Sequence, residues 1–324
     1  MGGDFAPNAV VQGALDAINK SSKPLNLILV GDETAIRSEL AGRENDAIEI
    51  VHTDEVVTMD DKGSKVLKSK PNSSLVRGIR MVKDGRADGF ISAGHTGAIM
   101  STTLLSLGRI PGVRRPALAA YFPTEKRGKI LCDVGVNPDA KPEHLVQFAL
   151  MASHYYDHVE GFAAPKIGLI NIGTEPSKGS ELYVETYKLL SEMPNFVGNI
   201  EGRHLLTSEA DVLICDGFVG NTLLKFAESW ITFFADEIKD KINEKLSYKI
   251  GAGLMKPIFD DLKAKYDYEE HGGTPLLGVN GISIVCHGSS GPKSIMNSIF
   301  LGQKCIENNL IEDTQKSLAI HFGH

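Results

Sequence analysis

The sequence predicts an α/β protein with three layers, α/β/α, built on a largely parallel, doubly wound sheet. Two patterns predict this class. Short apolar runs of strand length alternate with segments that carry apolar residues at helical spacing, and glycine-containing turns follow several of the runs. Strands that alternate with helices form parallel sheets covered on both faces. We expect the 324 residues to form a single domain, 1–324, with a protruding helical hairpin inserted at about 229–270.

Each element is predicted from its local pattern. Helices are predicted where apolar residues recur every three or four positions, as Val10 and Ala14 do, or where proline suits a first turn, as Pro142 does. Strands are predicted at short apolar runs between breakers, such as 167–172, which ends at Gly173. The predicted strands are 24–30, 47–51, 87–91, 117–122, 129–133, 167–172, 211–216 and 281–286. The predicted helices are 9–18, one that opens at 31–33, 75–83, 98–107, 142–156, 182–190, 222–245, 254–266 and 292–300. The polar segment 53–71 is predicted to be a surface loop and partly ordered helix, and 247–253 an interruption.

Composition limits the classes of function. The formal net charge of −7 and the pI of about 5.8 disfavour general nucleic-acid binding. The four cysteines show no CxxC spacing and predict buried free thiols in a cytosolic protein. No secretory signal is visible, and no apolar run approaches the roughly 20 residues that a membrane span needs. We therefore expect a cytoplasmic protein that is soluble or peripherally membrane-associated.

The segment 166–181 is the first candidate for a binding site. A buried strand is followed by a glycine-broken polar turn and then by a helix, and this construction directs backbone N–H groups and the positive end of a helix dipole at an anion. Lys178 lies where that dipole disfavours a cation, which indicates an anionic partner. The alternative is that Lys178 is only solvated.

The same strand–turn–helix construction recurs at 92–97, 133–137, 216–221 and 287–290. Loops after parallel strands gather at one edge of the sheet, so we expect all five turns to form one ligand site there. The candidate catalytic residues are Lys178, His95, His287 and Asp216. The candidate residues for binding the substrate, an anion, are Gly94, Thr96, Gly97, Asn137, Asn171, Gly173, Thr174, Asn221, Ser289 and Ser290.

Plainer interpretations of these residues stay open. The histidines can be hydrogen-bonded turn residues, and the carboxylates and amides can be helix caps. Nucleotide-binding glycine motifs, a hydrolase serine elbow and metal-ligand spacings are absent from the sequence, so we expect no metal and no cofactor.

Two further surfaces are candidates for partner binding. Arg109, Arg114 and Arg115 lie in a proline-rich loop and suit an acidic partner, or are simply solvated. The apolar segment 254–259 is either a core or dimer surface, or an apolar tip that dips into a membrane interface.

Several motifs, taken in order, resemble the bacterial PlsX family of acyl-[acyl carrier protein]:phosphate acyltransferases. They are Met1-Gly-Gly-Asp4, Ser92-Ala-Gly-His-Thr-Gly97, Gly108-Arg-Ile-Pro-Gly112, Asn171-Ile-Gly-Thr-Glu175 with Lys178-Gly179, Gly198-Asn-Ile-Glu-Gly202, Asp216-Gly-Phe-Val-Gly-Asn221, and Leu277-Gly-Val-Asn-Gly281 with His287-Gly-Ser-Ser290. The match covers almost the whole chain. Two departures are His95, where the family has an amide, and the β-strand that usually precedes Met-Gly-Gly-Asp, which we expect the sheet to lack.

The resemblance implies that inorganic phosphate attacks the thioester of an acyl carrier protein, and that the acyl phosphate then feeds a membrane glycerol-3-phosphate acyltransferase. It also implies a homodimer with loose membrane contact. Phosphate is already an anionic nucleophile, so the chemistry needs an anion cradle and stabilisation of the carbonyl oxygen. The arginine loop and the segment 126–129 would meet the acidic carrier. Two rivals are a phosphotransacetylase-like enzyme that uses acyl-coenzyme A and a non-catalytic carrier-binding protein.

Overall fold

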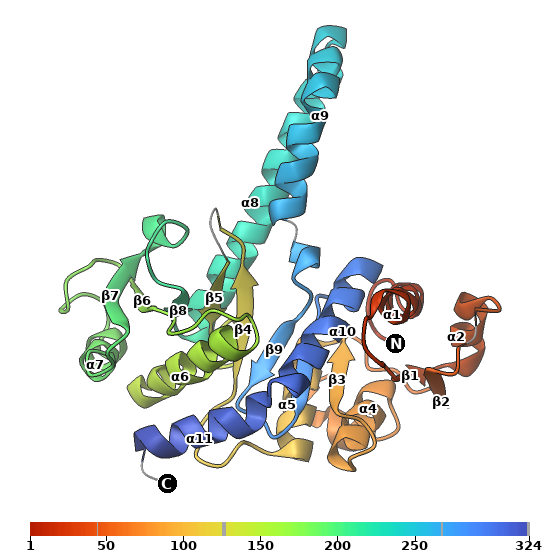
Figure 1. Cartoon of the computed structure of the whole chain (residues 1–324), viewed down its shortest axis with the longest axis horizontal. Coiled ribbons are helices and arrows are strands. Elements are labelled where there is room, and N and C mark those ends of the chain that lie inside the picture. The colour runs from red at the N-terminus through yellow and green to blue at the C-terminus, as the bar shows by residue number, and fades with distance from the viewer. Residues whose placement is uncertain (44, 125–127, 267, 323–324) are drawn as a thin grey trace.

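The computed structural model describes residues 1–43, 45–124, 128–266 and 268–322 (Figure 1). Eight strands form one sheet in the order β3-β10-β9-β4-β5-β8-β6-β7, and β1 and β2 pair separately in parallel. The strands are β1 (Leu27–Gly31), β2 (Ile48–His52), β3 (Gly89–Ser92), β4 (Ala117–Phe122), β5 (Lys129–Cys132), β6 (Ile167–Asn171), β7 (Phe196–Glu201), β8 (Val212–Ile214), β9 (Thr274–Leu277) and β10 (Ile282–Val285). Five of the eight strand pairings among the described residues are parallel, which confirms the predicted class.

The sheet reverses its direction in the middle. The pairs β10–β9, β9–β4 and β4–β5 are antiparallel, whereas β3 is parallel to β10 and β5 is parallel to β8. It follows that β3, β10 and β4 run one way, and that β9, β5, β8, β6 and β7 run the other way. This reversal was not predicted from the sequence. The reversal determines at which end of the sheet each candidate site residue lies.

Alternating side chains of the strands feed two cores, one on each face. On β4, Ala117 and Ala119 belong to one core, and Leu118 and Ala120 belong to the other. The helices that bury the first face include α6 (Pro142–His158), α7 (Glu181–Leu190), α10 (Pro292–Glu307) and α11 (Leu310–Phe322). The second face packs against α4 (Ser74–Lys83), α5 (Thr96–Leu107) and the first turns of α8 (Gly217–Glu244). A third cluster joins α1 (Asn8–Lys20) and α2 (Glu33–Leu40) to β1 and α10.

Helix α8 and helix α9 (Leu246–Tyr266) form the protruding hairpin (Figure 1). The predicted interruption at 247–253 is wrong, because these residues continue α9 and the chain reverses at Lys245. The segment 254–259 therefore lies within α9, beyond its first two turns, and not at a tip between two helices. A Cβ on Gly251 or Gly253 would meet open space, so packing does not require glycine at either position.

Three elements were not predicted. Strand β7 contains Gly198 and Asn199, strand β9 contains Pro275, and all three residues are depleted in strands. Helix α11 follows α10 after only Asn308 and Asn309, where no strand separates the two helices. In each case, packing against neighbouring elements outweighs a weak local signal.

Candidate active site

The five predicted turns lie at two opposite ends of the strands. The turns after β3 and β10 lie at one end, and the turns after β5, β6 and β8 lie at the other, because the sheet reverses between these sets. A strand rises about 3.3 Å per residue, so the ends of even a four-residue strand are on the order of 10 Å apart. No hydrogen bond or ion pair joins the two groups of turns among the described residues. The expectation of a single edge is wrong.

The first group, which we call the histidine end, joins the turns 92–97 and 287–291 to the N-terminal segment. The backbone N–H of Asp4 donates to the carbonyl of Gly288 over 2.9 Å. A Cβ on Gly3 would lie 3.0 Å from the carbonyl oxygen of Ala93 and 3.3 Å from that of Gly288, so a side chain there would push these two turns apart slightly. Three backbone segments far apart in the sequence therefore meet where α5 and α10 begin.

His95 caps helix α5. Its Nδ1 accepts a hydrogen bond of 3.2 Å from the backbone N–H of Ala98, so in the neutral ring the proton lies on Nε2. The backbone N–H groups of Thr96 and Gly97 have no acceptor among the described residues. The first turn of α5 thus offers several donors to an anion.

His287 has the same arrangement in the neighbouring turn. Its Nδ1 accepts from the backbone N–H of Ser289 at 3.3 Å and lies 2.6 Å from the Ser289 hydroxyl, which again leaves Nε2–H as the donor. The ring is exposed, whereas Ser290 is buried and accepts from the Ser294 hydroxyl at 3.1 Å. Gly94 donates to the Ser92 hydroxyl at 3.2 Å and shapes its turn.

The second group, which we call the aspartate end, is built around two buried carboxylates. Asp133 accepts from the backbone N–H groups of Leu118 and Asn137 and from the Asn137 amide, and that amide also donates to the Pro116 carbonyl. Burial raises the pKa of Asp133. Asp133 and Asn137 therefore connect β4, β5 and the following turn, and these bonds occupy the Asp133 carboxylate and the amide nitrogen of Asn137.

Asp216 caps helix α8 by accepting from the backbone N–H groups of Phe218 and Val219. Its second oxygen accepts from the Tyr183 hydroxyl at 2.6 Å. The pKa of Tyr183 is raised, mainly by burial and secondly by this hydrogen bond. Tyr183 is not among the site residues predicted from the sequence. Its place in the first turn of a helix that follows a glycine-containing turn is the only local signal that it carries.

The remaining predicted residues of the aspartate end surround Lys178. Asn171 is buried and donates to the Lys178 carbonyl at 3.0 Å, which holds the turn closed. The Lys178 side chain is 48% exposed, and its ammonium lies 3.9 Å from a carboxylate oxygen of Glu175. Gly173 is buried, whereas Thr174 and Asn221 are exposed, and the Asn221 side chain lies next to Gly135.

The arginine loop also lies at the aspartate end, since it precedes β4. Arg114 pairs with Glu143 at 2.9 Å, and Arg109 donates to the Arg114 carbonyl. Arg115 is exposed and has no side-chain partner among the described residues. Of the segment 126–129, Gly128 and Lys129 are described and lie at the other end of β4; Lys129 is buried with its ammonium on the Ala210 carbonyl, so it cannot meet a partner. Residues 126 and 127 lie outside the described part of the chain.

Comparisons with known proteins identify the family. Residues 1–313 match the model of the family described as "Fatty acid synthesis protein". A phosphate acyltransferase of Desulfitobacterium hafniense is 47% identical over 321 residues, which cover 98% of this chain and 96% of the relative. One from Moorella thermoacetica is 46% identical over 313 residues, covering 96% and 92%. The chain belongs to the PlsX family of phosphate acyltransferases.

Membership in the PlsX family makes the chain an acyltransferase. Its fold is shared with a phosphotransacetylase from Streptococcus pyogenes, with a TM-score of 0.60 at 17% identity over 92% of this chain and 91% of that one. A branched-chain phosphotransacylase from Enterococcus faecalis also has a TM-score of 0.60, at 15% identity over 94% and 96%. These two likenesses bear on the fold alone.

The described residues contain no group of three or more His, Cys, Asp and Glu side chains placed to hold a metal ion. They also contain no helix with the length and apolar character needed to cross a bilayer.

Proposed function

We propose that this PlsX-family chain transfers a fatty acyl group from the thioester of acyl-[acyl carrier protein] to inorganic phosphate. The observation that carries the proposal is the histidine end. His95 and His287 both keep Nδ1 as an acceptor and present Nε2–H, beside the unpaired N–H groups of the first turn of α5. This arrangement suits a phosphate and a carbonyl oxygen that becomes negative during the reaction.

The reaction needs little beyond this arrangement. An oxygen of hydrogen phosphate attacks the carbonyl carbon, the new C–O bond forms, and the C–S bond breaks with its electron pair going to sulfur. The proton of the hydrogen phosphate balances the thiol that is released. Because a thiol has a pKa of about 8.5, its thiolate is a good leaving group, and donors that stabilise the oxyanion supply most of the catalysis. The histidine Nε2–H groups donate to that oxyanion or to the leaving sulfur.

The aspartate end has a supporting role in this proposal. Asp216, Asn137 and Asn171 already form hydrogen bonds within the protein, so they hold the turns in place. Lys178 is exposed and is the group at this end that we propose to attract the anionic substrates. Arg109, Arg114 and Arg115, at the same end, form the proposed contact with the acidic carrier protein.

The hairpin is the proposed surface for dimer and membrane contacts. Large apolar side chains are exposed along it, namely Phe226, Trp230, Phe233, Phe234, Ile250, Leu254, Met255, Ile258 and Phe259. An exposed apolar surface of this extent marks an interaction site. We propose a homodimer and a peripheral position at the cytoplasmic face of the membrane, where a membrane glycerol-3-phosphate acyltransferase would take up the acyl phosphate. Liposome flotation of a Leu254→Asp, Phe259→Asp variant tests the membrane contact, and unchanged binding would exclude these residues from it.

The deciding experiment is phosphate-dependent release of free thiol from palmitoyl-[acyl carrier protein], with acyl phosphate trapped by hydroxylamine. A rate that saturates with phosphate supports the proposal. Faster turnover with palmitoyl-coenzyme A would favour the phosphotransacetylase-like alternative. Binding of the carrier without thiol release would instead favour a non-catalytic role.

A further inference from the structure

One loop crosses the histidine end and touches both of its turns. We call residues 58–63 the bridging loop. Gly63 packs on the first turn of α5, where a Cβ on it would lie 2.7 Å from the carbonyl carbon of Gly97. The Ser101 hydroxyl donates to the Gly63 carbonyl at 2.7 Å and so fastens the loop to α5. At its other end, the Met59 methyl group lies beside Gly288.

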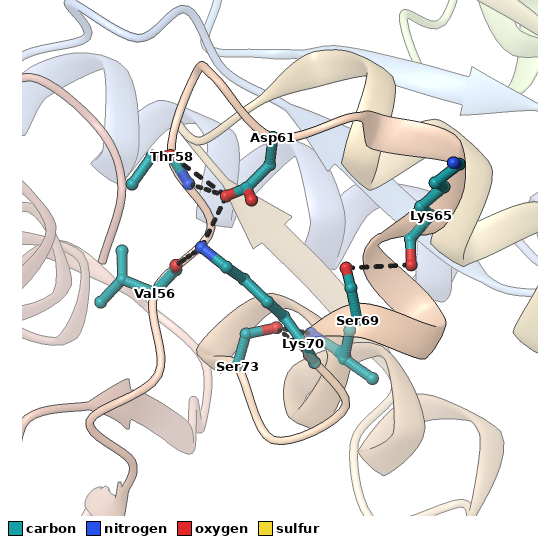
Figure 2. Close-up of polar contacts among 8 residues, drawn as sticks. Val56, Thr58, Asp61, Lys65, Ser69, Lys70 and Ser73 are labelled. Carbon is teal, nitrogen blue, oxygen red and sulfur yellow. Dashed lines mark hydrogen bonds and ion pairs between the residues drawn. The ribbon is translucent and has the colours of Figure 1, made fainter.

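A lysine outside the bridging loop holds the loop in this shape. The ammonium of Lys70 donates to the Val56 carbonyl and to the Asp61 carboxylate, each at 2.7 Å (Figure 2). The same carboxylate oxygen accepts from the backbone N–H of Thr58 at 2.7 Å and from its hydroxyl at 3.1 Å. Lys70 thereby joins the residues before the loop to Asp61 within it.

The backbone around Lys70 is itself anchored. The Ser73 hydroxyl donates to the Lys70 carbonyl at 2.8 Å and caps helix α4, and Ser73 is fully buried (Figure 2). The side chains of Lys70 and Asp61 are only 26% and 21% exposed. This pair is therefore more sheltered than most ion pairs of the described surface and is anchored to the core through α4. A partly buried, multiply hydrogen-bonded pair keeps its geometry better than an exposed one.

We propose that Lys70 and Asp61 are positioning residues for the phosphate site, because they hold the bridging loop over the first turn of α5 and beside Gly288 in the turn that precedes α10. The inference rests on the function proposed above. The loop packs through Gly63 on the turn whose N–H groups would bind phosphate. When the pair is broken, the loop moves away from α5, and phosphate loses one wall of its site.

The test compares Lys70→Met, Lys70→Arg and Asp61→Asn with the wild type. Loss of ground-state positioning raises the KM for phosphate more than it lowers kcat. We expect the phosphate KM of Lys70→Met to be about ten-fold above that of the wild type. Lys70→Arg keeps the charge, and its KM is expected within about three-fold of wild type. The Lys70→Met, Asp61→Asn double variant is expected to be no worse than Lys70→Met alone, because the two residues act as one unit. The matched control is Lys23→Met, which breaks a surface pair with Glu307 at 2.6 Å, far along the chain from the loop.

Hydrogen exchange gives a readout that does not depend on turnover. The backbone N–H of Thr58 is expected to exchange faster in Lys70→Met and at the wild-type rate in Lys23→Met. Unchanged exchange in Lys70→Met overturns the inference, even if the wild type shows no phosphate-dependent thiol release. Faster exchange with an unchanged phosphate KM in an active enzyme overturns it too, as does an equal rise in KM for Lys23→Met. Absence of turnover in the wild type counts only against the proposed function.

Discussion

The hydroxyl of Tyr183 in helix α7 lies 2.6 Å from Oδ2 of Asp216, the residue that caps helix α8. The other carboxylate oxygen accepts two backbone N–H groups, so the carboxylate is fully engaged. An acid held in this way positions a helix and is a poor general base. The bond joins the turns after β6 and β8 and gives the aspartate end a structural function.

Tyr183→Phe should therefore lower stability without lowering turnover. Removing the hydroxyl leaves one buried carboxylate oxygen without its donor, which costs about 1–3 kcal/mol. Thermal unfolding should show a lower Tm, while kcat with saturating substrates stays near that of the wild type. Tyr187→Phe in the same helix is the control, since its hydroxyl has no hydrogen bond among the described residues. A large fall in kcat for Tyr183→Phe would show that Asp216 takes part in the reaction.

His95→Asn and His95→Asp form a matched pair at the histidine end. Both side chains are good helix caps, so the free energy of unfolding of both variants should lie within about 1 kcal/mol of that of the wild type. The Asn amide still offers an N–H donor, whereas the Asp carboxylate offers none and repels phosphate. We expect Asn to retain most of kcat/KM and Asp to lose about 100-fold or more, as for a removed oxyanion donor. Equal activity of the two variants would restrict His95 to capping.

Lys178→Ala tests whether the aspartate end contacts the reactants. Removal of an exposed lysine that attracts phosphate should raise the phosphate KM several-fold with little change in stability, because its one ion pair among the described residues is a 3.9 Å contact with Glu175. Steady-state kinetics over a range of phosphate concentrations measure this directly. Lys188→Ala is a suitable control, as another exposed lysine with a carboxylate three residues away. If kcat and the phosphate KM of Lys178→Ala both match the wild type, Lys178 has no part in catalysis.

Arg115→Glu tests the proposed carrier surface. Since Arg115 has no side-chain partner among the described residues, charge reversal there should leave the fold intact. The KM for acyl-[acyl carrier protein] should rise several-fold at low salt, and its dependence on ionic strength should weaken. Lys20→Glu makes the same change in net charge at the end of helix α1. If the two variants raise the KM for acyl-[acyl carrier protein] equally, the effect comes from the overall charge of the protein and not from a local contact of Arg115.

The pair of Lys70 and Asp61 should also show in acid unfolding. The hydrogen bond from Lys70 holds the pKa of Asp61 below its ordinary value. A carboxyl group with a lowered folded pKa stabilises the protein above its unfolded pKa, and this contribution is lost as the pH falls through the folded pKa. The stability difference between wild type and Asp61→Asn should be constant from pH 8 to about 5 and should shrink below about pH 4, near the ordinary carboxyl pKa. A difference that does not change down to the acid transition would contradict this pairing in solution.

Much of the architecture could be predicted from local pattern. The strand β6 and the helices α1, α5 and α6 were predicted to within a few residues, because apolar spacing and prolines are decisive there. The short strand β9, with its Pro275, carries no such signal. Its pairing with β10 and β4 is long-range, and that pairing reverses the direction of the sheet.

The sequence by itself determined the family, the alternation of strands and helices, and the residue types in each turn. Only the tertiary structure decided which turns meet. His95 and His287 lie together because β3 and β10 are adjacent and parallel, whereas Lys178 and Asp216 lie at the opposite end of the sheet. The physical reason is that a turn's residues report its own conformation, while its neighbours depend on strand order and direction. Those are set by hydrogen bonds and packing between segments far apart in the chain.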